Sequence, residues 1–124
     1  MKQWGVIFIA LVTASLSQAA PVYIEMAPEF VVNYGDVGRL KYMKAQVTIR
    51  AVDDEAALEV NYHSDFIRHE LIMLFSRQLP SIVNSPEGKE AMLNEATKAV
   101  QRIMRNETGR PMIDQVLFTN FVAP

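Results

Sequence analysis

The chain has 124 residues, of which 50% are hydrophobic and 21% charged, the composition of one ordinary globular domain. Its 12 basic and 14 acidic residues give a formal charge of -2, so no excess of Lys and Arg favours nucleic acid, and no nucleic-acid partner is expected. The absence of cysteine excludes disulfides, thiol chemistry and a lipid anchor on cysteine.

The first segment of the chain has the pattern of an export signal. Lys2 supplies a positive charge, and residues 4–14, WGVIFIALVTA, are all apolar or small. This run is shorter than the roughly 20 residues that span a bilayer and matches the roughly 7 to 15 of a signal-peptide core. Ser17 and Ala19 suit a cut after Ala19. We predict a signal peptide over residues 1–19, the alternative being an uncleaved signal anchor that associates the protein with the membrane.

Two short β-prone runs follow, at residues 22–26 and 30–33, separated by Ala27 and Pro28. The Gly and Asp residues of the YGDVG stretch, 34–38, predict a turn and therefore a hairpin with the next strand.

That next strand, within residues 39–52, has the clearest alternation in the chain. Its apolar residues Met43, Ala45, Val47, Ile49 and Ala51 alternate with Lys44, Gln46, Thr48 and Arg50. One face should therefore be buried. Leu40 and Tyr42 have the opposite parity, which predicts a bulge near Tyr42 and Met43.

Residues 53–55 break the strand pattern, and residues 55–61 are expected to form a short helical turn or a loop, followed by two helices. The first covers residues 64–79, with Ser64 or Asp65 as its cap and Pro80 as its end. Ser85 and Pro86 predict the start of the second, and Gly109 its end.

A last strand is expected within residues 111–122, where Phe118 and Phe121 have opposite parity and predict apolar contacts on both faces. The order of elements predicts an α+β fold, with an antiparallel or mixed sheet and two helices packed on one face. We place one domain over residues 22–123, and expect that losing residues 116–122 unfolds it.

Residues that could do chemistry are few. His63 and His69 lack a metal motif, and residues 53–55 could be paired carboxylates but are better explained as a solvated loop. No nucleophile elbow or phosphate-binding loop is present. We therefore expect no enzyme activity, no catalytic or metal site and no cofactor, with an exported ligand-binding protein or hydrolase using these residues as a remaining alternative.

Two groups of polar residues are candidates for interaction. Lys44, Gln46 and Arg50 share the polar face of the long strand, which a solvated sheet face also explains. Arg102 and Arg105 lie near the end of the second helix, where they also stabilise the negative end of its dipole.

Five stretches resemble the flagellar basal-body-associated FliL family. They are YIEMAPEFVVNY, GRLKYMKAQVTIRAVD, RHELIMLFSRQ, SPEGKEAMLNEATKAVQRIM and VLFTNFV, in that order. Together they cover about residues 23–122, and the SPEGKEAM helix start followed by the VLFTNFV terminus is fairly specific.

The resemblance implies a stomatin-like (band 7-like) domain in the periplasm that associates with flagellar stator and motor proteins at the basal body. It also implies self-assembly into a homo-oligomer and support of motility without catalysis. Family members usually have a full membrane helix and a linker before this domain, so the short apolar run at residues 4–14 is a departure. The alternative is a general envelope scaffold with the same core and no flagellar role.

Overall fold

A computed structural model of the protein describes residues 5, 20–35, 38 and 40–124. Within these residues the elements are, in order, β1 (Val22–Tyr34), β2 (Lys41–Ala51), α1 (Asp54–Tyr62), α2 (Ser64–Ser76), α3 (Pro80–Val83), α4 (Pro86–Thr108) and β3 (Ile113–Val122). Apart from Gly5, the predicted signal at residues 1–19 lies outside the described residues.

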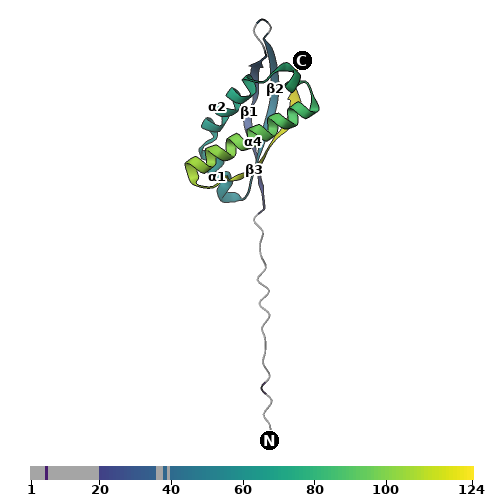
Figure 1. Ribbon diagram of the computed structural model, residues 1–124. Coiled ribbons are helices and arrows are strands. Elements are labelled where there is room, and N and C mark those ends of the chain that lie inside the picture. The colour runs from purple at the N-terminus through teal and green to yellow at the C-terminus, as the bar shows by residue number, and fades with distance from the viewer. Residues whose placement is uncertain (1–4, 6–19, 36–37, 39) are drawn as a thin grey trace.

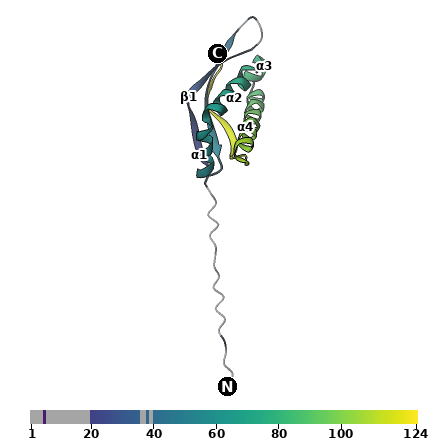
Figure 2. The same cartoon turned by 90° about the vertical axis from the view of Figure 1, so that its left-hand side faces the viewer.

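The three strands form one antiparallel sheet with β2 in the centre. The helices form a layer on one face of this sheet, as the two views in Figures 1 and 2 show. The α+β class, the antiparallel sheet and the pairing of the last strand with the long earlier one are therefore confirmed. The side chains on the helix-covered face are called the inner face below, and those on the opposite side the outer face.

The first strand is continuous, although two short runs were predicted from its sequence. Its pairing with β2 shifts register between Met26 and Phe30, and the peptide bond between Ala27 and Pro28 is cis. Pro28 lies in this irregularity, where no ladder hydrogen bond is required of it. The two runs are thus joined by a bulge and do not form separate strands.

The bulge predicted near Tyr42 is wrong. Tyr42 pairs with Asn33 and Met43 with Val32, without a shift of register between them. Tyr42 is 49% exposed on the outer face, whereas Met43 is fully buried on the inner face. Ordinary strand alternation therefore explains the apparent change of parity.

The prediction for the two phenylalanines of β3 is also wrong, because both lie on the inner face. Phe118 pairs with Val47 and Phe121 with Ala45, since the register shifts between Gln46 and Val47. The ring centroids of Phe118 and Phe121 are 4.9 Å apart. A bulge in β3 adds one residue and brings the second ring back to the side of the first.

The helical layer contains more than the two predicted helices. The segment expected to be a short helical turn or a loop is the nine-residue helix α1. Its first turn is capped by the Asp53 carboxylate, which accepts from the Ala56 N–H at 2.7 Å. The α2 helix begins after His63, with no side-chain cap from Ser64 or Asp65. Burial of the small side chains of Ala56 and Ala57 holds α1 against the sheet.

The longest helix, α4, agrees with its sequence signals. The Ser85 hydroxyl accepts from the Gly88 N–H at 3.0 Å, and Pro86 occupies the first turn. Gly109 ends the helix with φ 88°, a left-handed conformation that glycine adopts without strain.

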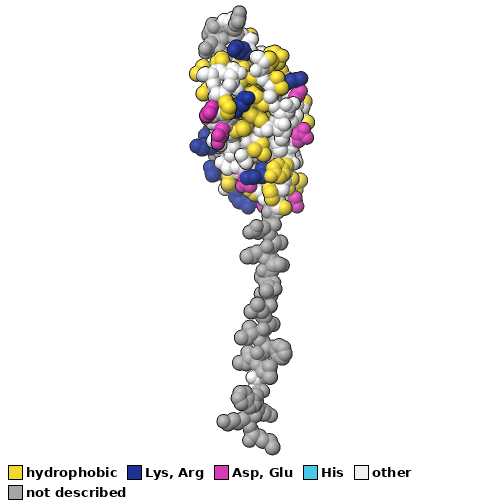
Figure 3. Space-filling view, turned by 90° about the vertical axis from the view of Figure 1, so that its right-hand side faces the viewer, with side chains coloured by type: hydrophobic (Ala, Val, Ile, Leu, Met, Phe, Trp, Pro, Cys, Tyr) yellow, Lys and Arg dark blue, Asp and Glu magenta, His cyan; other side chains and the backbone are white. Residues whose placement is uncertain are grey.

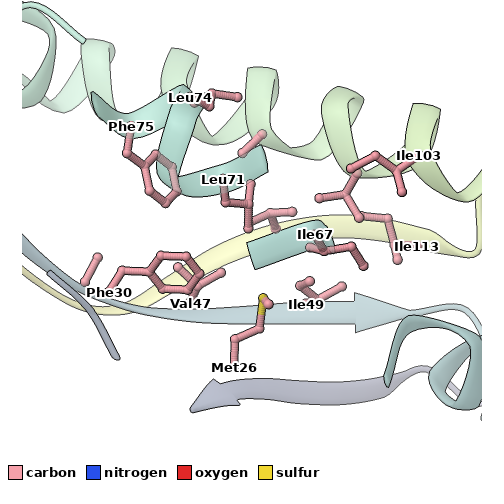
Figure 4. Close-up of a cluster of buried hydrophobic side chains, with 14 of the residues drawn as sticks. Met26, Phe30, Val47, Ile49, Ile67, Leu71, Leu74, Phe75, Ile103 and Ile113 are labelled. Atoms are coloured by element: carbon pink, nitrogen blue, oxygen red, sulfur yellow. The ribbon is translucent and has the colours of Figure 1, made fainter. Parts of the chain in front are cut away.

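The hydrophobic core lies between the sheet and the helices (Figure 4). Phe75 of α2 packs against both edge strands. Its ring centroid is 5.8 Å from that of Phe30 in β1 and 5.6 Å from that of Phe118 in β3. Val47 and Ile49 of the central strand are fully buried beneath it. The core therefore depends on all three strands at once.

Candidate functional site

Three predicted interaction residues lie on the outer face of β2. Lys44 Nζ is 3.3 Å from a carboxylate oxygen of Glu29, and Arg50 Nε is 3.5 Å from one of Asp114. The Gln46 side-chain amide donates to the Met26 carbonyl at 3.2 Å. Each of these contacts joins β2 to a neighbouring strand, so these residues support the sheet while they remain at least partly exposed.

Apolar side chains on the same outer face were missed by sequence reasoning. Tyr23 is 59% exposed, Val31 63%, Tyr42 49% and Val122 47%. The sequence does contain a signal for them, because each alternates in its strand with residues of the inner face. Only the polar residues at such positions were proposed as interaction residues, and Tyr42 was interpreted as evidence for a bulge. The outer face therefore combines apolar area with paired charges, a combination found on protein-binding surfaces.

Arg102 and Arg105 are exposed on α4, in the helical layer, and so form a surface separate from the outer face. Arg102 borders a groove of about 250 Å³ between α2 and α4. Its lining includes the apolar residues Phe66 and Ile103 and the charged residues Glu70, Arg102 and Glu107. The structure thus places Arg102 in a groove with both apolar and charged residues, but it does not bring the two predicted groups of interaction residues together.

A second groove, of about 210 Å³, lies between β1 and the helices α1 and α2. Its helical side includes Asn61, Ser64, Asp65 and Arg68. The Arg68 guanidinium is 4.1 Å from the centroid of the Phe30 ring, and its Nη2 donates to the Glu29 carbonyl at 3.2 Å. This groove was not predicted, because it depends on how α1 and α2 dock beside β1.

The residues considered for chemistry have separate structural surroundings. His63 Nε2 lies 3.7 Å from a Glu59 carboxylate oxygen on the same helix side, while His69 is exposed on α2. Asp53 caps α1. No group of three or more His, Asp or Glu side chains suited to a metal ion occurs in the described part of the chain.

Two general features of the molecule are the distribution of charge on its surface and the hydrophobicity of its helices. On the side of the molecule seen in Figure 3, basic and acidic side chains are interspersed with hydrophobic ones. Within residues 20–35 and 40–124, none of the helices has the length and hydrophobicity needed to cross a membrane.

Comparison with known proteins gives the family. The model of the family described as flagellar basal body-associated protein FliL matches residues 23–123, from the second residue of β1 to just past the end of β3. The chain belongs to the FliL family. The resemblance seen in the sequence is therefore confirmed.

Two relatives within the FliL family show how far the likeness extends. The chain is 27% identical over 101 residues to the flagellar protein FliL of Aquifex aeolicus, a match that covers 82% of this chain and 60% of the relative. It is 26% identical over 103 residues to the flagellar protein FliL of Escherichia coli K12, covering 83% of this chain and 65% of the relative. The chain thus spans less than two thirds of the length of these relatives.

Proposed function

We propose that the protein is a non-catalytic component of the flagellar basal body that supports flagellum-dependent motility. The observation that carries this proposal is the FliL family match, which runs over the whole of the folded region, residues 23–123. Two relatives, from distant bacteria, are both named flagellar protein FliL. The proposed mechanism is binding to stator and motor proteins, together with self-assembly of the chain.

The exposed surfaces give this mechanism two places to act. The outer face offers Tyr23, Val31 and Tyr42 beside the paired charges of Lys44 and Arg50. In the helical layer, Arg102 lines a groove that also includes Phe66 and Ile103, and Arg105 is exposed on the same helix. Apolar area with a polar rim is what a reversible protein partner requires.

The cellular placement belongs to the same proposal. Residues 1–19 would direct export, either as a cleaved signal or as an anchor in the inner membrane, and the domain at residues 22–123 would work in the periplasm. The stomatin-like core implied by the resemblance is also part of this proposal.

A clean deletion in the host tests the role. Swimming speed and the torque of tethered cells should fall, and the wild-type gene supplied in trans should restore both. Unchanged swimming, swarming and torque in the deletion strain would reject the flagellar role and favour a general envelope scaffold.

A charge-reversal pair tests whether Arg102 and Arg105 contact a partner. Arg102→Glu with Arg105→Glu should complement the deletion poorly while the protein accumulates normally. The matched control is Arg77→Glu with Lys98→Glu, since both residues are exposed and the charge change is the same. Equal complementation by the two pairs would remove the arginines from the proposed surface.

A further inference from the structure

The two edges of the sheet are protected unequally. Along β3, the Gln101 amide of α4 donates to the Ile113 carbonyl at 3.0 Å, and the Thr97 hydroxyl accepts from the Val116 N–H at 3.0 Å. These side chains satisfy backbone groups that would otherwise be open to a new strand. The α4 helix therefore closes that edge over residues 113–116.

The opposite edge, formed by β1, has no such closure over residues 22–25. Beyond the ladder with β2, no hydrogen bond from the rest of the described chain reaches the backbone of these residues. In an antiparallel pair, alternate residues direct their N–H and C=O groups away from the partner strand. Among the described residues, a short row of backbone donors and acceptors at this edge is thus without a partner, and it ends at the bulge that contains Pro28.

A groove accompanies the free edge. The groove of about 210 Å³ described above is lined on the strand side by Ile24, Glu25, Met26 and Ala27, and on the helix side by Asn61, Ser64, Asp65 and Arg68. In Figure 2, α1 and α2 lie beside β1 on the helical side of the sheet. An added strand would therefore meet both a backbone ladder and polar side chains able to hold it.

Acidic residues predominate in the segments that form this edge and the helices beside it. Residues 22–27 and 53–65 contain six acidic residues and no Lys or Arg: Glu25, Asp53, Asp54, Glu55, Glu59 and Asp65. Two basic residues are also close. Arg50 pairs with Tyr23 across the sheet and is held by Asp114. Arg68 lines the groove, stacks on Phe30 and donates through Nη2 to the Glu29 carbonyl, while its buried Nη1 has no hydrogen-bond partner in the described chain. An acidic surround attracts a basic partner and repels an acidic one.

We propose that the free edge of β1 binds an extended peptide segment that carries Lys or Arg. The segment would add a strand to the sheet beside β1, with backbone hydrogen bonds providing affinity and the acidic side chains providing selectivity. This inference goes beyond the flagellar role and does not depend on it, because it rests only on the edge, the groove and the charge of the domain.

Peptide probes test the binding mode on the full chain. A fluorescent peptide of alternating Lys and Val should bind in an anisotropy titration, and the equivalent Glu and Val peptide should bind at least about tenfold more weakly. Two further Lys and Val peptides carry backbone N-methyl groups on either the odd or the even residues. Since only one set of amides can face β1, one methylated peptide should lose binding and the other should keep it.

Substitutions test whether the peptide binds at the edge of β1. Glu25→Lys with Asp65→Lys should weaken binding of the Lys and Val peptide by about tenfold or more, a change of about 1.4 kcal/mol. The matched control is Glu90→Lys with Glu95→Lys on α4, which makes the same charge change at exposed positions. If the first pair does not fold, as judged by its circular dichroism melt, the milder Glu25→Gln with Asp65→Asn replaces it.

Several results would overturn the proposal. The first is no binding of the Lys and Val peptide to the wild-type chain. Equal binding of both methylated peptides would mean charge attraction without strand addition, and equal weakening by both variant pairs would place binding elsewhere. A wild-type dimer in sedimentation that Glu25→Lys with Asp65→Lys dissociates would assign the edge to a second copy of this chain.

Discussion

At the scale of single residues, Gly88 shows how packing can reverse an intrinsic preference. A glycine inside a helix ordinarily costs about 0.5 to 1 kcal/mol relative to alanine, so Gly→Ala usually stabilises. Here a Cβ atom would collide with the Ile82 backbone carbonyl and lie 2.6 Å from the Ser85 Oγ that caps α4. We expect Gly88→Ala to lower the free energy of unfolding by about 1 to 3 kcal/mol.

Urea denaturation followed by circular dichroism measures this change. Ala91→Gly, at an exposed position in the same helix, is the control and should lose about 1 kcal/mol through propensity alone. A Gly88→Ala variant more stable than the wild type would show that α3 and α4 do not approach as closely as described.

Arg68 is the second residue whose geometry matters more than its charge. Its guanidinium is 4.1 Å from the Phe30 ring centroid and donates to Glu29, which ties α2 to the bulge of β1. Lysine keeps the charge but loses the planar group that stacks and donates together. We expect Arg68→Lys to cost about 1 to 2 kcal/mol of unfolding free energy.

The control for this substitution is Arg77→Lys, which lies just beyond the end of α2 and is exposed. Its thermal melt should match that of the wild type. If Arg68→Lys melts at the same temperature as Arg77→Lys, the stacked contact contributes nothing measurable.

At the scale of elements, α4 closes part of the β3 edge through Gln101 and through the hydroxyl of Thr97. Thr97 Oγ1 donates to the Leu93 carbonyl at 2.8 Å and accepts from the Val116 N–H at 3.0 Å. Thr97→Val preserves the shape and leaves the Val116 N–H without its acceptor. We expect a loss of about 1 to 3 kcal/mol, because an unsatisfied buried group is costly.

Amide hydrogen exchange reads out this contact directly. The Val116 amide should exchange faster in Thr97→Val, beyond the change in global stability. Thr119→Val serves as the control, since Thr119 is exposed on the same strand and the substitution there should leave Val116 protection unchanged. Unaltered Val116 exchange in Thr97→Val would mean that the hydroxyl does not close the edge.

The elements also show which parts of the fold can be predicted from local sequence. The start and end of α4 could be predicted because each depends on residues within one turn of that helix end, Ser85 and Pro86 at the start and Gly109 at the end. The face of Phe121 was not, because it depends on where β3 gains a residue relative to β2. Bulge positions follow from packing between distant segments, which a local pattern does not contain.

The same limit applies to the candidate sites. Lys44, Gln46 and Arg50 were placed on one face by the alternation of β2 alone. The groove beside β1 combines Glu25 with Asp65, residues 40 positions apart, and no periodicity links them. A site made by docking helices against a strand becomes visible only once the tertiary structure is known.

At the scale of the whole molecule, the last strand is required for the domain to fold. Val116 and Ile113 of β3 are at most 2% exposed, and the Phe118 ring packs on Phe75 in the middle of the core. Removing residues 116–124 would take away the second neighbour of β2 and expose Val47, Ile49 and Phe75. A sheet of two strands with an open core is not expected to be stable.

We therefore expect the chain truncated after Gln115 to lack a cooperative melt and to aggregate. Loss of Ala123 and Pro124 alone is the matched control, because both residues follow the end of β3, and this shorter deletion should melt like the wild type. Thermal melts by circular dichroism, with gel filtration to detect aggregates, measure both. A soluble, cooperatively melting protein without residues 116–124 would show that β1, β2 and the helices suffice, and that β3 serves another purpose.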